Sequence, residues 1–159
     1  MHQQKNISRI LILVFAGVLI QACNIKRFIP EDELLYTGAE TTVVAADSIK
    51  VRERIKEEVE SVIMPKPNTK ILGGYPGLYF HYKAQKKKPG FINKFLKDKV
   101  GEEPVYASDV DLHETSDLID NRLENRGFFY SDINAEMEED SLAREAKAIY
   151  KVDLAQPYR

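Results

Sequence analysis

The chain contains little of what disulfide, metal or membrane-spanning structures require. Its 159 residues include one cysteine and no tryptophan, which excludes a disulfide framework and a cysteine zinc cage. No apolar run approaches the ~20 residues that a bilayer-spanning helix needs. Lys and Arg number 23 against 25 Asp and Glu, so the basic surplus that nucleic-acid binding requires is missing. Hydrophobic residues make up 43%, which is typical of a globular protein.

Catalytic motifs are also lacking. The sequence has no hydrolase nucleophile elbow, phosphate loop or dinucleotide fingerprint. Gly73, Gly74 and Gly77 are irregularly spaced and indicate turns. His81 and His113 stand alone, without neighbours at metal-ligand spacing. We therefore expect a protein that is not an enzyme, with no metal site.

The first residues have the pattern of a targeting signal. Lys5 and Arg9 precede an apolar run over residues 10–20, which is too short to span a bilayer but is typical of a secretory signal. The chain's cysteine follows directly, as Cys23 after Ala22. The sequence therefore predicts a signal peptide over residues 1–22.

The cleavage region resembles a bacterial lipobox. Ile20 stands three residues before Cys23 and the small Ala22 just before it, whereas Gln21 departs from the pattern. The resemblance implies a covalent, thioether-linked lipid on Cys23 and no other cofactor. The alternative is an ordinary signal peptide followed by a chance cysteine.

The residues after Cys23 bear on location. Asn24 replaces the aspartate that would retain a lipoprotein in the inner membrane, and the acidic residues 31–33 do not follow the cysteine directly. We expect a lipid anchor in the periplasmic side of the outer membrane. Residues 23–33 are interpreted as the lipidated tether.

The first half of the mature chain predicts a strand and then a helix. β-Branched and aromatic residues over 34–44 favour a strand, with a bulge at Gly38. Asp47 or Ser48 can cap a helix that runs to about residue 63. Its apolar stripe consists of Val51, Ile55, Val59 and Val62.

The second half predicts a helix and two strands. Ser108 with Asp111 approximates a capping box, and Gly127 stands where a helix reverses into a strand. The expected inner stripe consists of Leu112, Ser116, Ile119 and Leu123, with Leu118 beside it. Alternating residues then predict strands over 129–138 and 146–154.

These elements predict an α+β fold. The order is β-α-α-β-β, with a small mixed three-stranded sheet and two helices on one face, because each helix has one apolar stripe to bury. An insert of about residues 68–105 separates the two helices.

The insert is basic and aromatic. A helix over residues 91–99 is expected, with Phe91, Phe95, Ile92 and Leu96 inward. The aromatic residues Tyr75, Tyr79, Phe80 and Tyr82 form either a satellite core or a binding platform. The lysines are either a solvated loop or a lipid-facing patch, and comprise Lys83, Lys86, Lys87 and Lys88, followed by Lys94, Lys97 and Lys99.

The segment 123–133, with leucine, polar residues, glycine, aromatics and then a strand, resembles the POTRA domain of outer-membrane assembly proteins. Segments 66–73, 93–96 and 101–105 are similar to the first module of TamL-like proteins in the TamA/BamA superfamily. The resemblance implies a POTRA-like domain over 34–155, and residues 156–159 look like the start of a following module. TamL-like proteins continue into a membrane barrel, for which 159 residues are too few, so the expectation is a fragment or a barrel-less relative.

The resemblance implies a periplasmic scaffold or chaperone that binds extended clients by β-augmentation. Its partners would be unfolded outer-membrane proteins, adjacent POTRA modules with a barrel, and a TamB-like inner-membrane protein. The strand after Gly127 would be the open edge and the last strand central. The expected edge residues are Phe129, Tyr130, Ser131, Asp132, Ile133, Asn134 and Ala135. In one alternative this edge only packs on the next module; in another the chain is a free-standing lipoprotein whose insert binds a glycan or small ligand.

Overall fold

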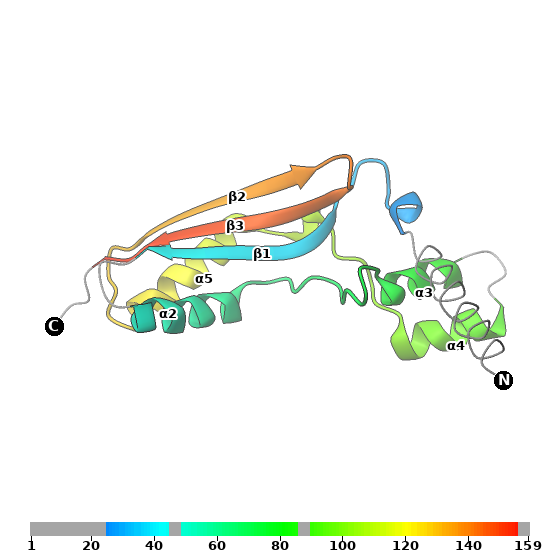
Figure 1. The fold of residues 1–159 in the computed structure, drawn as a ribbon, viewed down its shortest axis with the longest axis horizontal. Coiled ribbons are helices and arrows are strands. Elements are labelled where there is room, and N and C mark those ends of the chain that lie inside the picture. The colour runs from blue at the N-terminus through cyan, green and yellow to red at the C-terminus, as the bar shows by residue number, and fades with distance from the viewer. Residues whose placement is uncertain (1–24, 45–48, 86–89, 156–159) are drawn as a thin grey trace, which may run out of the picture. The chain divides into compact units, whose positions relative to one another are not determined.

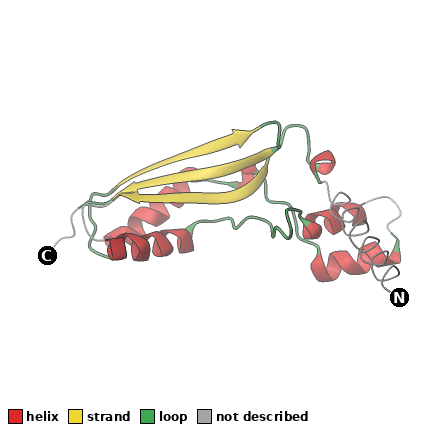
Figure 2. Cartoon of the chain, in the orientation of Figure 1, coloured by secondary structure: helices red, strands yellow, loops and turns green. Residues whose placement is uncertain are grey.

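The computed structural model describes residues 25–44, 49–85 and 90–155, which fall into two compact units (Figure 1). The sheet unit comprises Pro30–Pro67 and the residues from Val105 onward. The insert unit comprises Asn68–Pro104 together with residues 25–29. The described strands lie in the sheet unit, and the helices of the insert unit are short (Figure 2).

The sheet has three strands, β1 (Leu35–Val44), β2 (Asp132–Asp140) and β3 (Glu145–Asp153). Their order is β1-β3-β2, with β1 parallel and β2 antiparallel to the central β3. The prediction that the last strand is central and the strand after Gly127 is an edge is confirmed.

The bulge expected at Gly38 is present. The register of β1 shifts between Tyr36 and Ala39, and Gly38 has φ +122, a conformation that side chains disfavour. A Cβ at this position would lie 3.3 Å from Pro67 Cγ. Glycine is therefore favoured by the backbone conformation, and the close approach of Pro67 leaves little room for a Cβ.

Two helices cover one face of the sheet: α2 (Ile49–Val62) lies against β1, and α5 (Leu112–Glu124) lies against β2 (Figure 1). Ile55 and Val59 of α2 are fully buried, as their stripe predicted. The expected caps of α2, Asp47 and Ser48, lie outside the described residues.

The cap of α5 differs from the prediction. Asp111 is the N-cap, and its Oδ1 accepts hydrogen bonds from the N–H groups of His113 and Glu114, both at 2.9 Å. Ser108 instead lies in a separate 3-10 turn, η2 (Ala107–Asp109), because Val110 is extended and interrupts the helix. The predicted capping box at Ser108 is therefore wrong, whereas the acidic residue assigned to it does cap the helix.

The end of α5 follows the prediction. Gly127 has φ +86, and the N–H groups of Gly127 and Phe128 donate back to the carbonyls of Glu124 and Leu123 at 2.9 and 3.0 Å. This pattern satisfies the last helical carbonyls while the chain reverses.

β2 begins later than predicted. Phe129, Tyr130 and Ser131 precede it, because Tyr130 takes a turn conformation with φ +64 and the Ser131 hydroxyl donates to the Phe128 carbonyl at 3.2 Å. Of the seven predicted edge residues, only those from Asp132 to Ala135 lie in the strand.

One core lies between the sheet and the two helices. Ile119 and Leu123 of α5 are buried as predicted, whereas Leu118 is 43% exposed, so its placement beside the stripe is wrong. The core consists of Tyr36, Val43, Ile55, Val59, Ile63, Ile119, Leu123, Phe128, Ala148, Tyr150 and Val152. The predicted α+β fold, with a mixed three-stranded sheet and an insert between its helices, is confirmed and is compatible with a POTRA-like fold.

The insert unit consists of η1 (Lys26–Phe28), α3 (Pro76–Ala84) and α4 (Phe91–Val100). α3 and α4 pack together. The start and the end of the insert segment 68–104 are joined by a hydrogen bond, in which Asn68 Nδ2 donates to the Glu103 carbonyl at 2.7 Å. Ile25 and Ile29, in the segment interpreted as a tether, are each only 5% exposed.

Helix α3 was not predicted, because Pro76 and Gly77 look like helix breakers. Pro76 instead occupies the first turn, where its missing N–H costs nothing. Helix α4 was predicted at its observed position, but Phe91 is 86% and Phe95 54% exposed, so the prediction that they point inward is wrong. The side chains of Ile92 and Leu96 lie outside the described part of the structure.

Candidate functional site: an open sheet edge with an acidic groove

The outer side of β2 carries unpaired backbone groups. The Leu35 N–H donates to the Arg144 carbonyl and the Leu154 N–H donates to the Val44 carbonyl, so even-numbered positions along β3 direct their backbone groups to β1. Odd-numbered positions of β3 therefore face β2. The observed register pairs these with even-numbered residues of β2.

The odd-numbered residues of β2 consequently direct their N–H and C=O groups away from the sheet. These residues are Ile133, Ala135, Met137 and Glu139. No described residue outside the sheet supplies a backbone partner to them. Their backbones form an open template for one further strand.

The opposite margin of the sheet is partly covered. The Tyr36 N–H donates to the Val105 carbonyl at 2.9 Å, and the Ala107 N–H donates to the Leu34 carbonyl at 2.8 Å. Residues 105–107 thus cap the start of β1, and the Gly38 bulge bends the strand just beyond. Among the described residues, β2 is the longer uncovered edge.

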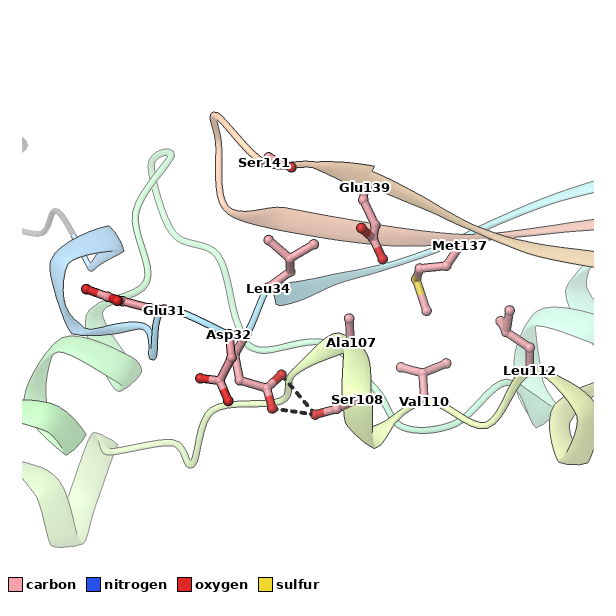
Figure 3. A pocket seen from close by; sticks show the side chains of 11 residues that line it. Glu31, Asp32, Leu34, Ala107, Ser108, Val110, Leu112, Met137, Glu139 and Ser141 are labelled. Atoms are coloured by element: carbon pink, nitrogen blue, oxygen red, sulfur yellow. Dashed lines mark hydrogen bonds between the residues drawn. The ribbon is translucent and has the colours of Figure 1, made fainter.

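A groove lies beside the last part of β2 (Figure 3). It has a volume of about 540 Å³. Met137 and Glu139 point from β2 toward Ala107 and Val110, which form the opposite side (Figure 3). Leu112, at the start of α5, extends the apolar lining. The groove therefore lies directly next to two of the outward-directed backbone positions.

The rim of the groove is acidic. Glu31, Asp32, Glu33 and Glu139 line it, and no described Lys or Arg forms an ion pair with them. The Ser108 hydroxyl donates to both carboxylate oxygens of Glu33 at 2.9 Å (Figure 3), which orients this charge without neutralising it. The guanidinium of Arg144 donates to the Pro30 carbonyl rather than to a carboxylate.

The sheet face away from the helices is polar. Lys147 of β3 lies 2.9 Å from Glu40 on β1 and 3.2 Å from Glu138 on β2, so one ammonium links all three strands. The hydrogen bond that Lys147 donates lowers the pKa of Glu40, and the hydrogen bonds that it donates to Glu40 and Glu138 raise the pKa of Lys147. This arrangement ties Glu138 to the sheet and leaves Glu139, on the other face, for the groove.

No protein-family model, curated protein or solved structure matches this chain.

Several predicted site residues lie outside the described part of the structure. They are the expected lipidation site Cys23 and three lysines of the expected basic patch, Lys86, Lys87 and Lys88. The fourth, Lys83, is described, and its Nζ lies 5.2 Å from the centre of the Tyr79 ring, in cation–π contact.

The aromatic residues of the insert contact one another. Phe28 stacks on Tyr82 at 5.4 Å between ring centres and meets Tyr79 edge-on at 6.5 Å. Tyr75 is only 5% exposed. Of the two interpretations of these rings, the packing favours a satellite core over a binding platform.

The two histidines in the described part of the chain differ in environment. His81 is buried in α3, with its Nε2 2.7 Å from Gln85 Nε2. His113 is exposed at the start of α5, 3.6 Å from Asp117. Within the described ranges, no group of three or more His, Cys, Asp and Glu side chains could hold a metal ion, and no helix is long and apolar enough to cross a membrane.

The sequence did not reveal the groove. Its walls come from residues 31–34, 107–112 and 137–141. The first two segments are joined by the Leu35–Tyr106 bridge and by the hydrogen bond from the Ala107 N–H to the Leu34 carbonyl, and the third is held by pairing with β3. The one local indication of the groove in the sequence is the run of acidic residues at 31–33, which was interpreted above only in relation to lipoprotein sorting.

Proposed function

We propose that this protein is a periplasmic scaffold module that binds extended polypeptides by adding them to the β2 edge of its sheet. The observation that carries the proposal is the open edge itself, with outward-directed backbone groups at residues 133, 135, 137 and 139. Backbone pairing makes little demand on client sequence, which suits a module of an outer-membrane assembly or translocation machine of the TamL/BamA type.

The groove next to Met137 and Glu139 would supply side-chain preference. A strand added to β2 alternates its side chains between the two faces of the sheet. Those on the helix face, opposite residues 137–139, would lie over the apolar lining formed by Ala107, Val110 and Leu112. The acidic rim would favour lysine or arginine close to these apolar side chains, and it would disfavour acidic clients.

The remaining parts of the proposal concern location and partners. A lipid on Cys23 would hold the module at the periplasmic side of the outer membrane. Unfolded outer-membrane proteins would be the clients, and an adjacent module or a TamB-like inner-membrane protein would use the same kind of edge pairing. No step of this function requires catalysis.

A peptide titration followed by backbone amide shifts tests the edge. The probe is a ten-residue peptide of alternating apolar residues and lysine, which copies the alternation of a barrel strand. We expect the largest shifts at the amides of residues 133, 135, 137 and 139. The same peptide with N-methyl groups on the paired side should cause none of them.

Two variants at one position sharpen the experiment. Ala135→Pro removes an outward-directed N–H without removing a hydrogen bond to β3, because proline is tolerated on the open side of an edge strand. Ala135→Val keeps the N–H. Peptide binding should be lost in the first variant and retained in the second, with unchanged β3 amides in both. Binding that survives Ala135→Pro, or shifts confined to residues 75–99, would reject the proposal.

A further inference from the structure

We infer that helix α4 is a membrane-contact element, whose exposed Phe91 and Phe95 enter the interface of an anionic phospholipid bilayer. The inference goes beyond the peptide-binding function, because it uses the other unit of the molecule and a different kind of partner.

The two phenylalanines are the first observation. Phe91 is 86% and Phe95 54% exposed, and residues four apart lie on the same face of a helix. Exposed phenylalanines next to each other on one helix leave apolar area in water, which a bilayer interface would cover. Asp98 and Lys99 are exposed in the same helix, so the face is rimmed by polar groups.

Charge is the second observation, and it selects the kind of surface. Residues 23–29 and 68–104 carry ten Lys and Arg against three Asp and Glu, a net charge of +7. Residues 30–67 and 105–159 carry 11 Lys and Arg against 22 Asp and Glu, a net charge of −11. The exposed phenylalanines thus belong to the basic unit, and basic residues near a bilayer bind anionic headgroups.

Chain length is the third observation. Ile25 is buried in the insert unit, and only Asn24 stands between it and Cys23, so the two residues are at most about 7 Å apart. If Cys23 carries its proposed lipid, the insert unit must sit at the membrane surface. This step rests on the proposed lipidation, whereas the first two do not.

Vesicle binding tests the inference without the lipid. The sample is the mature chain, residues 23–159, with Cys23→Ser, so that neither signal peptide nor acyl chain contributes. We expect it to co-sediment with vesicles of equal parts phosphatidylglycerol and phosphatidylcholine, and much less with phosphatidylcholine alone. The double variant Phe91→Ala, Phe95→Ala should lower the partition coefficient about tenfold or more, since each phenylalanine loses most of its apolar area.

The matched control is Leu142→Ala, which removes an apolar side chain that is 94% exposed from the acidic unit and should leave vesicle binding unchanged. No binding to anionic vesicles, an equal loss in Leu142→Ala, or phenylalanine-dependent self-association without vesicle binding would each overturn the inference. The double variant should bind the β2 peptide normally, so a failure of this inference and a failure of the proposed function give different results.

Discussion

The sheet unit and the insert unit differ in both charge and construction. The sheet unit has a net charge of −11 and one apolar core beneath a three-stranded sheet. Residues 23–29 and 68–104 have a net charge of +7, and the insert unit is built from short helices and aromatic contacts. The net charge of the whole chain is therefore small although its two units carry opposite charges. The difference teaches that partners should be assigned unit by unit: a basic client to the sheet edge and an anionic surface to the insert.

The largest expected effects come from removing one core side chain in each unit. Ile119 and Leu78 are both fully buried, and Ile or Leu→Ala in a core costs about 2–5 kcal/mol. Ile119→Ala should reduce the hydrogen-exchange protection of β3, whereas Leu78→Ala should open α3 and leave β3 protected. Equal loss of β3 protection in Leu78→Ala would show that the two units unfold as one block. Leu118→Ala, at a position that is 43% exposed, is the control and should have a small effect.

A second test uses alkaline pH to weaken the sheet unit alone. The hydroxyl of Tyr36 is buried and has no hydrogen-bond partner among the described residues, and burial raises the pKa of Tyr36 to about 12. The neutral phenol is thus favoured in the folded state. The contribution of the neutral Tyr36 phenol to the free energy of unfolding is complete below pH 10, the ordinary pKa of tyrosine. It is lost as pH rises from about 10 to 12, by roughly 2–3 kcal/mol.

Tyr36→Phe should remove the part of the loss that comes from Tyr36, because the phenol at this position is gone, whereas the buried Tyr150, whose pKa burial also raises, remains. Urea unfolding at pH 9 and at pH 11.5 measures it: the variant should lose less stability between the two than the parent. At neutral pH the variant should be equally stable or more stable, since an unpaired buried hydroxyl is removed. Tyr130→Phe, at a position 96% exposed, should behave like the parent at both pH values. An identical alkaline loss in Tyr36→Phe would contradict the assignment.

The sheet unit could be predicted from the sequence because its signals are periodic. Ile55 and Val59 of α2 follow helical spacing, and Ala148, Tyr150 and Val152 of β3 alternate. Both periods report which face is buried, and Gly127 marks the reversal between α5 and β2 through its backbone conformation.

The insert unit and the groove could not be predicted in the same way. Pro76 breaks a helix in one context and starts one in another, so α3 was missed. Phe91 was predicted to point inward only because it is apolar, and its exposure shows that this prediction is wrong. The groove depends on three chain segments, which are brought together by the Leu35–Tyr106 bridge and by the pairing of β2 with β3, and no local pattern encodes these long-range contacts.

The smallest expected effect concerns the closure of the insert unit, which should weaken in acid rather than in alkali. Burial acts to raise the pKa of Glu102, but hydrogen bonds from the Thr69 N–H at 2.7 Å and from Asn68 Nδ2 at 3.3 Å outweigh it and lower the pKa. A carboxyl with a lowered pKa contributes stability above its ordinary pKa, and that contribution is lost as pH falls through the folded-state value.

Glu102→Gln should therefore loosen the insert unit at neutral pH by about 1 kcal/mol, because hydrogen bonds to a charged group are replaced by weaker neutral ones. Hydrogen exchange of the α3 amides at pH 7 and pH 3.5 measures this: the parent should lose protection in acid, and the variant should change little between the two. Glu103→Gln is the matched control, since Asn68 contacts the backbone carbonyl of Glu103 and not its side chain. If the α3 amides of Glu102→Gln still lose protection in acid, another titrating group closes the insert. The contrast between an acid-sensitive insert and an alkali-sensitive sheet would then no longer depend on Glu102.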